Sequence, residues 1–285
     1  MTAAAIVRPA GIGAFLRAMT GDPRAALGLG LVALAAVAAL AAPLIAPYAP
    51  DFTDFANTLS PPSGAHWLGT DELGRDVLAR IIYGAQTSLF VGILSVVVAA
   101  VAGTGLGLMA GYFGRWAEAL IMRVMDVVFA FPSILLALAI TAVLGPSLSN
   151  AVLAIAVVNL PVYARIARAQ TLVVRQLEFV EAKRALGFGT PNILLRTILP
   201  NILAPVIVQG SLLFASAIIT ESYLSFLGLG AQPPTATWGN MLRNAIGFME
   251  LAPWLALFPG AAIFLTVLGC NLLGDGLRDR FDPRD

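Results

Sequence analysis

Five long stretches without a charged residue constrain the fold of this chain more than any other feature. A helix needs about 20 predominantly apolar residues to cross the hydrocarbon core of a bilayer, and each stretch reaches that length. None of them alternates apolar and polar residues as the strands of a membrane β-barrel do. The stretches, which predict membrane-spanning helices, are 25–50, 81–114, 127–164, 197–220 and 251–274.

The stretch 127–164 is too long for one membrane-spanning helix. As a single helix it would measure about 57 Å, whereas the hydrocarbon core is about 30 Å thick. Gly145, Pro146 and Ser147 interrupt it with residues that favour a turn, so it predicts two helices. We therefore expect an all-α membrane protein with six spans, at 25–46, 87–110, 125–144, 150–169, 202–222 and 253–273.

The composition of the 285 residues agrees with a polytopic membrane protein. Hydrophobic residues make up 59% of the chain and charged residues 12%, whereas soluble domains have about 25% charged residues. The net charge of +1 gives no reason to expect a nucleic-acid partner. The single cysteine, Cys270, excludes an internal disulfide, and the single histidine, His66, excludes a histidine-rich metal site.

The distribution of arginine and lysine predicts the orientation in the membrane. Fourteen of the 17 basic residues lie in segments on the same side as the N-terminus, and three, Arg75, Arg80 and Arg243, lie on the other side. Cytoplasmic loops carry such an excess, so both termini are predicted to be cytoplasmic. We expect the first span not to be a cleaved signal peptide, because of its length and the 24 residues before it.

The spans divide the chain into a few larger segments. In the outer loop, Thr70, Asp71 and Glu72 are typical of a helix start, and an amphipathic helix is predicted to lead from there into the second span. The predicted segments are a cytoplasmic segment 1–24, the first span 25–46, an outer loop 47–86, a five-helix core 87–273 with an inside loop 170–200, and a cytoplasmic tail 274–285.

The inside loop contains a short predicted helix over 177–186. Phe179, Ala182 and Leu186 form its apolar stripe, and Gly187 provides a C-terminal stop in the left-handed conformation. A short amphipathic helix on the cytoplasmic side is typical of a docking element, although a solvated connector would also fit this composition.

Several enzymatic motifs are missing from the sequence. It has no phosphate-binding G-x-x-x-x-G-K-[ST] loop, no H-E-x-x-H zinc motif and no G-x-S-x-G nucleophile elbow. We therefore expect no catalysis, no cofactor and no metal site on this chain. Asp126, Glu221 and Asp275 lie only at span ends, so the mid-membrane charges common in ion-coupled carriers are absent.

Four polar residues inside the predicted spans are candidates for lining a transport path. Kinked helices can line such a path, and Pro161 lies close to one of the four. Hydrogen bonding between helices is an equally good explanation for polar residues at these positions. The four residues are Asn159, Gln209, Ser216 and Thr220.

Part of the inside loop resembles the signature E-A-A-x(3)-G-x(9)-I-x-L-P of ABC importer permeases. The glycine and the Leu-Pro pair are in register, whereas Lys183 replaces the second alanine and Thr197 replaces the isoleucine. The matching positions are Glu181, Ala182, Gly187, Leu199 and Pro200, and the three variable positions before the glycine are Arg184, Ala185 and Leu186.

Three further segments resemble the C-type subunit of the dipeptide/oligopeptide/nickel branch of these permeases. They lie in the two outer loops and near the C-terminus, so the resemblance covers nearly the whole chain beyond residue 20. The segments are 66–71 with 74–78, 221–230 with Trp238-Gly239 and Met241-Leu242, and 271–279.

This resemblance implies a type I ABC importer (MetI-like) permease fold in a prokaryotic cell membrane, with peptides or similar small solutes as substrate. It implies that Phe179 and Glu181–Gly187 form the coupling helix that contacts a separate ATPase. Two such ATPases would bind ATP and magnesium, a B-type permease would complete the path, and an extracytoplasmic binding protein would dock outside. Asp71, Arg75, Asp76, Glu221 and Trp238 match outer-face positions of the family, where structural bracing is the alternative to a direct role.

A self-sufficient secondary transporter or channel remains an alternative, and it would direct attention to Asp126 and Glu221. A membrane protein with a purely structural role is a third, but it would need neither kinked helices nor long loops. The sequence does not identify the substrate.

Overall fold

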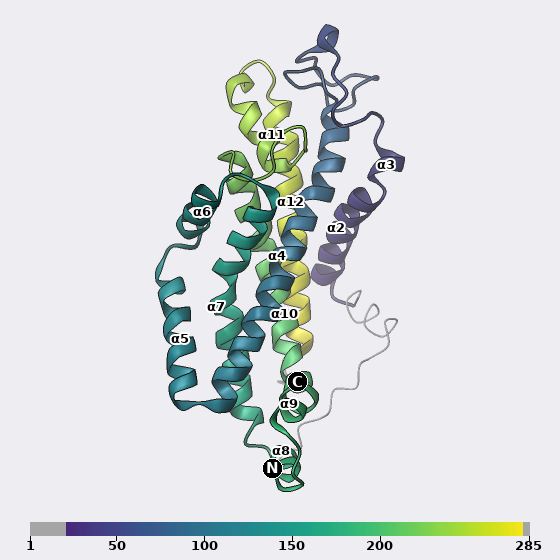
Figure 1. Cartoon of the computed structure of the whole chain (residues 1–285). Coiled ribbons are helices and arrows are strands. Elements are labelled where there is room, and N and C mark those ends of the chain that lie inside the picture. Colours follow the sequence, from purple (N-terminus) through teal and green to yellow (C-terminus); the bar gives the residue numbers. More distant parts are fainter. Residues whose placement is uncertain (1–20, 282–285) are drawn as a thin grey trace.

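The computed structural model describes residues 21–281, which form helices and loops without a β-strand. Five helices are long and apolar enough to cross a membrane. The second, third and fifth of these helices run in one direction, and the first and fourth run in the other (Figure 1). They are α2 (Pro23–Leu40), α4 (Val77–Phe113), α7 (Leu148–Val174), α10 (Leu199–Phe226) and α12 (Trp254–Phe281).

The predicted span 125–144 is a broken helix pair and begins earlier than expected. α5 (Arg115–Ala130) and α6 (Ser133–Leu144) are bent by 93° relative to each other. Pro132 disfavours the helical conformation at the preceding residue, and Phe131 accordingly has the extended angles φ −85° and ψ 141°. The charged residues of 115–124 excluded that segment from the predicted span.

α4 begins at a different residue from the predicted helix start. Asp76, rather than Thr70, is the N-cap, and its Oδ1 accepts a hydrogen bond of 2.7 Å from the Ala79 N–H. The amphipathic segment and the predicted span 87–110 are thus one continuous helix. Residues 70–76 instead form a compact turn closed by an isolated bridge between Thr70 and Asp76.

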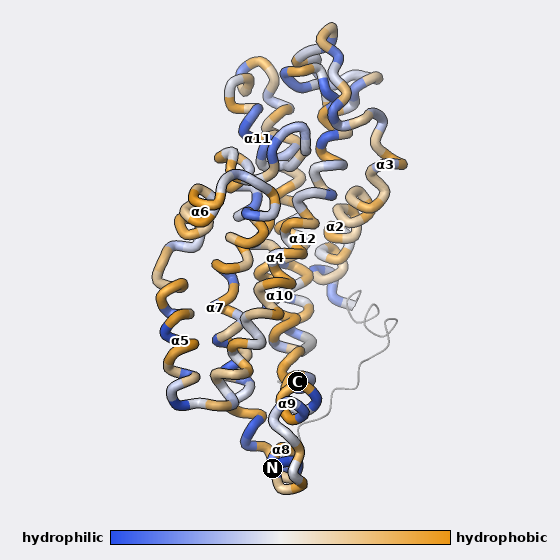
Figure 2. The backbone as a smooth tube through the Cα atoms, viewed as in Figure 1, coloured by the Kyte–Doolittle hydropathy of each residue, from blue (hydrophilic) through white to orange (hydrophobic). Residues whose placement is uncertain are grey.

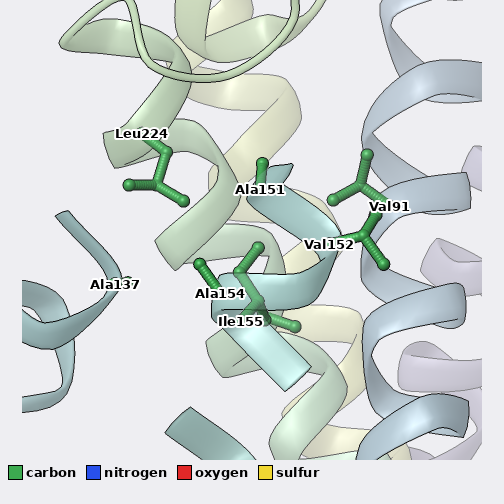
Figure 3. Close-up of a cluster of buried hydrophobic side chains, with 8 residues drawn as sticks. Val91, Ala137, Ala151, Val152, Ala154, Ile155 and Leu224 are labelled. Carbon is green, nitrogen blue, oxygen red and sulfur yellow. The ribbon is translucent and has the colours of Figure 1, made fainter. Parts of the chain in front are cut away.

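α4 and α7 pack closely because glycines line one face of α4. Gly103, Gly107 and Gly111 recur every four residues and face α7. A methyl group on Gly103 would lie 2.7 Å from the Leu160 carbonyl oxygen, so only glycine permits this approach. Figure 3 shows an apolar cluster closer to the start of α4, where four helices meet. Its members include Val91 of α4, Ala137 of α6, Leu224 of α10, and Ala151, Val152, Ala154 and Ile155 of α7.

The short elements gather at the two ends of the bundle (Figure 1). The end with α8 also holds the last turns of α12, which continues through most of the predicted tail 274–285. Figure 2 shows a hydrophobic middle on the long helices between two more polar ends. Most of the predicted segment 1–24, and residues 282–285, lie outside the described part. The short elements are α3 (Ala42–Ile45), η1 (Phe55–Asn57), α8 (Glu178–Ala185), α9 (Thr190–Ile193), η2 (Leu194–Ile198), α11 (Trp238–Ala245) and η3 (Ile246–Phe248).

Candidate functional site

α8 has a well-defined C-terminal stop at the predicted glycine. Gly187 has φ +79°, its N–H donates to the Arg184 carbonyl at 3.0 Å, and the Phe188 N–H donates to the Lys183 carbonyl at 3.1 Å. These two bonds are the pair found in a Schellman motif, which needs a residue in the left-handed conformation. The predicted helix 177–186 is thus confirmed, with Leu177 and Leu186 as its caps.

α8 has one side against the bundle and one side free. Val180 is fully buried in an apolar cluster that includes Ile193 and Ile198. On the other side, Phe179 is 43% exposed and Leu186 is 75% exposed. Glu181, Ala182, Arg184 and Ala185 are exposed as well. The predicted apolar stripe therefore faces away from the chain and is available to a partner.

Polar contacts fix α8 to the helices behind it. Lys183 Nζ donates a hydrogen bond of 2.9 Å to Thr197 Oγ1, in the π-helical segment η2. The Arg184 guanidinium lies 5.1 Å from the ring centroid of Tyr112, at the end of α4. Arg175, just before α8, donates to the Gly111 carbonyl at 2.7 Å. These contacts connect α8 with both α4 and the base of α10.

Three of the four predicted path residues line one cavity of about 270 Å³. α7 contributes Asn159, and α10 contributes Ser216 and Thr220. Phe129 of α5 and Phe131, between α5 and α6, also line the cavity. Gln209 lies outside this cavity. It is two turns before Ser216 on α10, so it lies about 10 Å further along the helix axis.

A second, charged hollow of about 670 Å³ lies beside α5 and α7. Asp126 and Arg165 form an ion pair of 2.8 Å in it, and Glu118 pairs with Arg168. The Arg165 guanidinium also lies 4.1 Å from the centroid of the Phe129 ring, which lines the first cavity. The two cavities therefore adjoin at the group formed by Asp126, Phe129 and Arg165.

Sequence reasoning missed most of this charged hollow. Its α5 side consists of Arg115, Glu118, Ala119, Met122, Arg123 and Asp126. Their spacing of three or four residues is the signal of one helix face, although residues 115–124 lie between the predicted spans 87–110 and 125–144.

The predicted outer-face residues form a buried ion-pair network. Asp71 Oδ2 accepts from Arg75 Nε at 2.7 Å and lies 3.5 Å from Arg80 Nε. Asp71 Oδ1 accepts from the backbone N–H groups of Leu73 and Arg75, both at 2.9 Å. Asp76 Oδ2 lies 2.9 Å from His66 Nδ1 while its other oxygen caps α4. These contacts support a structural role for Asp71, Arg75 and Asp76, in which they hold the outer loop together.

Glu221 and Trp238 also serve packing between elements. Glu221 is 1% exposed and accepts from Ser88 Oγ at 3.0 Å and Ser225 Oγ at 2.7 Å. Trp238 begins α11, and its Nε1 donates to the Ile81 carbonyl of α4 at 3.0 Å. The two side chains therefore connect α4 with α10 and with α11, and neither of them lines either cavity.

Within residues 21–281, no three His, Cys, Asp or Glu side chains are grouped so that they could hold a metal ion.

Two family models match this chain. Residues 103–284 match the binding-protein-dependent transport system inner membrane component family, and residues 14–62 match the N-terminal TM domain of oligopeptide transport permease C.

Curated relatives match over most of their length. The dipeptide transport system permease protein DppC of Alkalihalophilus pseudofirmus is 51% identical over 85% of this chain and 80% of the relative. The glutathione transport system permease protein GsiD of Pectobacterium atrosepticum is 48% identical over 91% and 86%. The di/tripeptide transport system permease protein DppC of Pseudomonas aeruginosa is 46% identical over 98% and 94%.

A solved structure has a similar fold. A chain of the MetNI methionine ABC transporter, in an inward-facing conformation, matches with a TM-score of 0.53. The match covers 69% of this chain and 95% of the other, at 15% sequence identity.

Proposed function

This chain belongs to the binding-protein-dependent transport system inner membrane component family, and on that premise we propose that it is a permease subunit of an ATP-driven peptide importer. The observation that carries the proposal is a continuous connection. The exposed stripe of α8 belongs to a helix that is hydrogen-bonded to η2, and η2 continues into α10, which lines the cavity. The names of the relatives support dipeptides, glutathione or similar short peptides as substrate.

We infer six membrane spans, with α5 and α6 together forming the third. With α5 and α6 counted as one span, successive spans run in alternating directions, and α12 ends on the side of α8 (Figure 1). That side is the cytoplasmic side by the distribution of basic residues. The chain would lie in the cell membrane with its outer loops and α11 on the opposite face.

The proposed partners follow from what this chain has and lacks. It carries an outward-facing helix but no phosphate-binding loop, so ATP and magnesium would bind to two separate ATPase subunits that contact α8. A B-type permease would close the other side of the cavity. A binding protein would deliver the peptide to the outer face.

The two adjoining cavities are the proposed half of the translocation path. Charged side chains facing lipid are strongly unfavourable, so the charged face of α5 belongs next to water or protein. A zwitterionic peptide would pass from the polar cavity at Asn159 and Ser216 to the charged hollow at Asp126 and Arg165.

Purification of the tagged chain from its native membrane tests this function. The expected result is a complex with two ATPase chains and one different permease, measured by mass spectrometry. Recovery of the chain alone or as a homo-oligomer, with transport that survives ATP depletion, would contradict the proposal and support a secondary transporter.

A bulkier side chain in the cavity is expected to reduce transport without disturbing assembly. Ser216 is exposed to the cavity, so Ser216→Leu would fill part of its volume of about 270 Å³. We expect peptide uptake to fall about tenfold, with the complex recovered in normal stoichiometry. Gln209→Leu is the matched control on the same helix and outside the cavity. Equal uptake by the two variants would rule out this cavity as the path.

A further inference from the structure

The two positions that depart from the permease signature contact each other. Lys183 stands where the second alanine is usual and Thr197 where isoleucine is usual, and Lys183 Nζ donates to Thr197 Oγ1 at 2.9 Å. A polar pair has thus replaced two apolar residues in adjoining elements.

The position of Lys183 on α8 directs its side chain toward the bundle. Lys183 follows Val180 by three residues, so both lie on the inner side of the helix. Val180 is fully buried, and Lys183 is half-buried in a helix whose other polar residues are exposed. Thr197 is 4% exposed, so the hydrogen bond is partly shielded from water.

The acceptor of this bond lies in the one π-helical segment among the described residues. η2 spans Leu194–Ile198 and continues directly into α10. Pro200 lacks an N–H and cannot make the usual bond to the carbonyl four residues earlier, which favours a local change of helix type. Such π segments are rare and are found frequently at functional sites.

Lys183 is the polar link from α8 to the helix that lines the cavity. Arg184 contacts Tyr112 on α4, which is a different helix. Val180 contacts the base of α10 only through apolar packing, which has no fixed direction. A hydrogen bond is directional, so it holds α8 and η2 in one register. Thr197 in turn is about five turns below Ser216 on a continuous helix.

We propose that the Lys183–Thr197 hydrogen bond transmits the displacement of α8 to α10 during the transport cycle. Lys183 and Thr197 are therefore positioning residues for coupling, and they touch neither ATP nor the peptide. This inference rests on the proposed function as an ATP-driven importer. It assigns ATPase docking to the outer side of α8 and transmission to its inner side.

The test uses the complete importer, reconstituted in vesicles with its binding protein, and measures peptide transported per ATP hydrolysed. Lys183→Met removes the ammonium and keeps the length of the side chain, and Thr197→Val removes the hydroxyl and keeps the shape. Each variant is expected to transport about fivefold less peptide per ATP, the effect of losing a hydrogen bond of ordinary net strength. The double variant is expected to be no worse than either single one, because both remove the same bond.

Two controls separate transmission from structure. Thr197→Ser retains the hydroxyl and is expected to keep most of the coupling. Arg196→Met removes an exposed cation beside Thr197 in η2 and is expected to leave peptide per ATP unchanged.

Three results would overturn the inference: unchanged coupling in both single variants, effects that multiply in the double variant, or loss of the ATPase from the Lys183→Met complex. The last would show that Lys183 serves docking. A wild-type complex without an ATPase would instead refute the proposed function itself, so the two failures are distinguishable.

Discussion

Replacing Gly187 by valine is expected to lower ATP-driven uptake at least about tenfold while the chain still inserts in the membrane. Gly187 has φ +79°, a conformation that β-branched residues strongly disfavour. Its new Cβ would meet no atom within 4 Å, so the effect comes from the backbone alone. The two hydrogen bonds that end α8 would be lost, and the chain after it would leave in another direction. Uptake and chain abundance in membranes measure the two parts of this prediction.

Gly189 provides the matched control for this experiment. It has φ −66°, which any residue adopts, and a methyl group there would meet only Pro191 Cδ at 3.9 Å. Gly189→Ala is therefore expected to transport normally. If Gly187→Val transported as well as Gly189→Ala, the end of α8 would have no part in coupling.

Replacing Asp71 by asparagine is expected to destabilise the outer face by about 3 kcal/mol, the typical effect of removing one partner from a buried ion pair. Asp71 accepts from Arg75 Nε and from two backbone N–H groups, and its other neighbour is Arg80. Arg75 and Arg80 are both buried; Arg80 would lose its ion-pair partner, and Arg75 would keep only Glu72. Thermal unfolding of the purified protein in detergent measures the expected lower midpoint.

Glu72 is a nearby control for Asp71. Its Oε1 accepts from Arg75 at 3.0 Å and from Asn244 at 2.9 Å, and its side chain is 20% exposed. Glu72→Gln keeps an oxygen acceptor in a site that water reaches. We therefore expect it to lower the free energy of unfolding by less than about 1 kcal/mol. A midpoint shift for Asp71→Asn no larger than that for Glu72→Gln would contradict bracing by Asp71.

The helical class and α8 were predictable because their signals are local. A charge-free stretch predicts a long helix whatever lies beside it, and the spacing of Phe179, Ala182 and Leu186 before Gly187 predicts a short helix with a stop. The prediction that a helix starts near Thr70 was wrong, because both Asp71 and Asp76 are suitable N-cap residues in the sequence. Only the turn of residues 70–76 selected Asp76.

The candidate path was predictable only in part. Asn159, Ser216 and Thr220 were found because polar residues in apolar helices are conspicuous, whereas Gln209, which is equally conspicuous, lies outside the cavity. The charged face of α5 was not predicted, because its Arg and Glu residues are as typical of a polar loop as of a helix. Their spacing fits one helix face, but their partners, Arg165 and Arg168 of α7, are visible only in the tertiary structure.

Local patterns in the chain were thus enough to predict a helical membrane protein with a short amphipathic helix in the inside loop. The meeting of Lys183 with Thr197, and of Asp71 with Arg80, depended on the tertiary structure. The reason is physical: burial and helix periodicity act on neighbours in the chain, whereas the partner of a polar side chain is set by how separate helices and loops are packed.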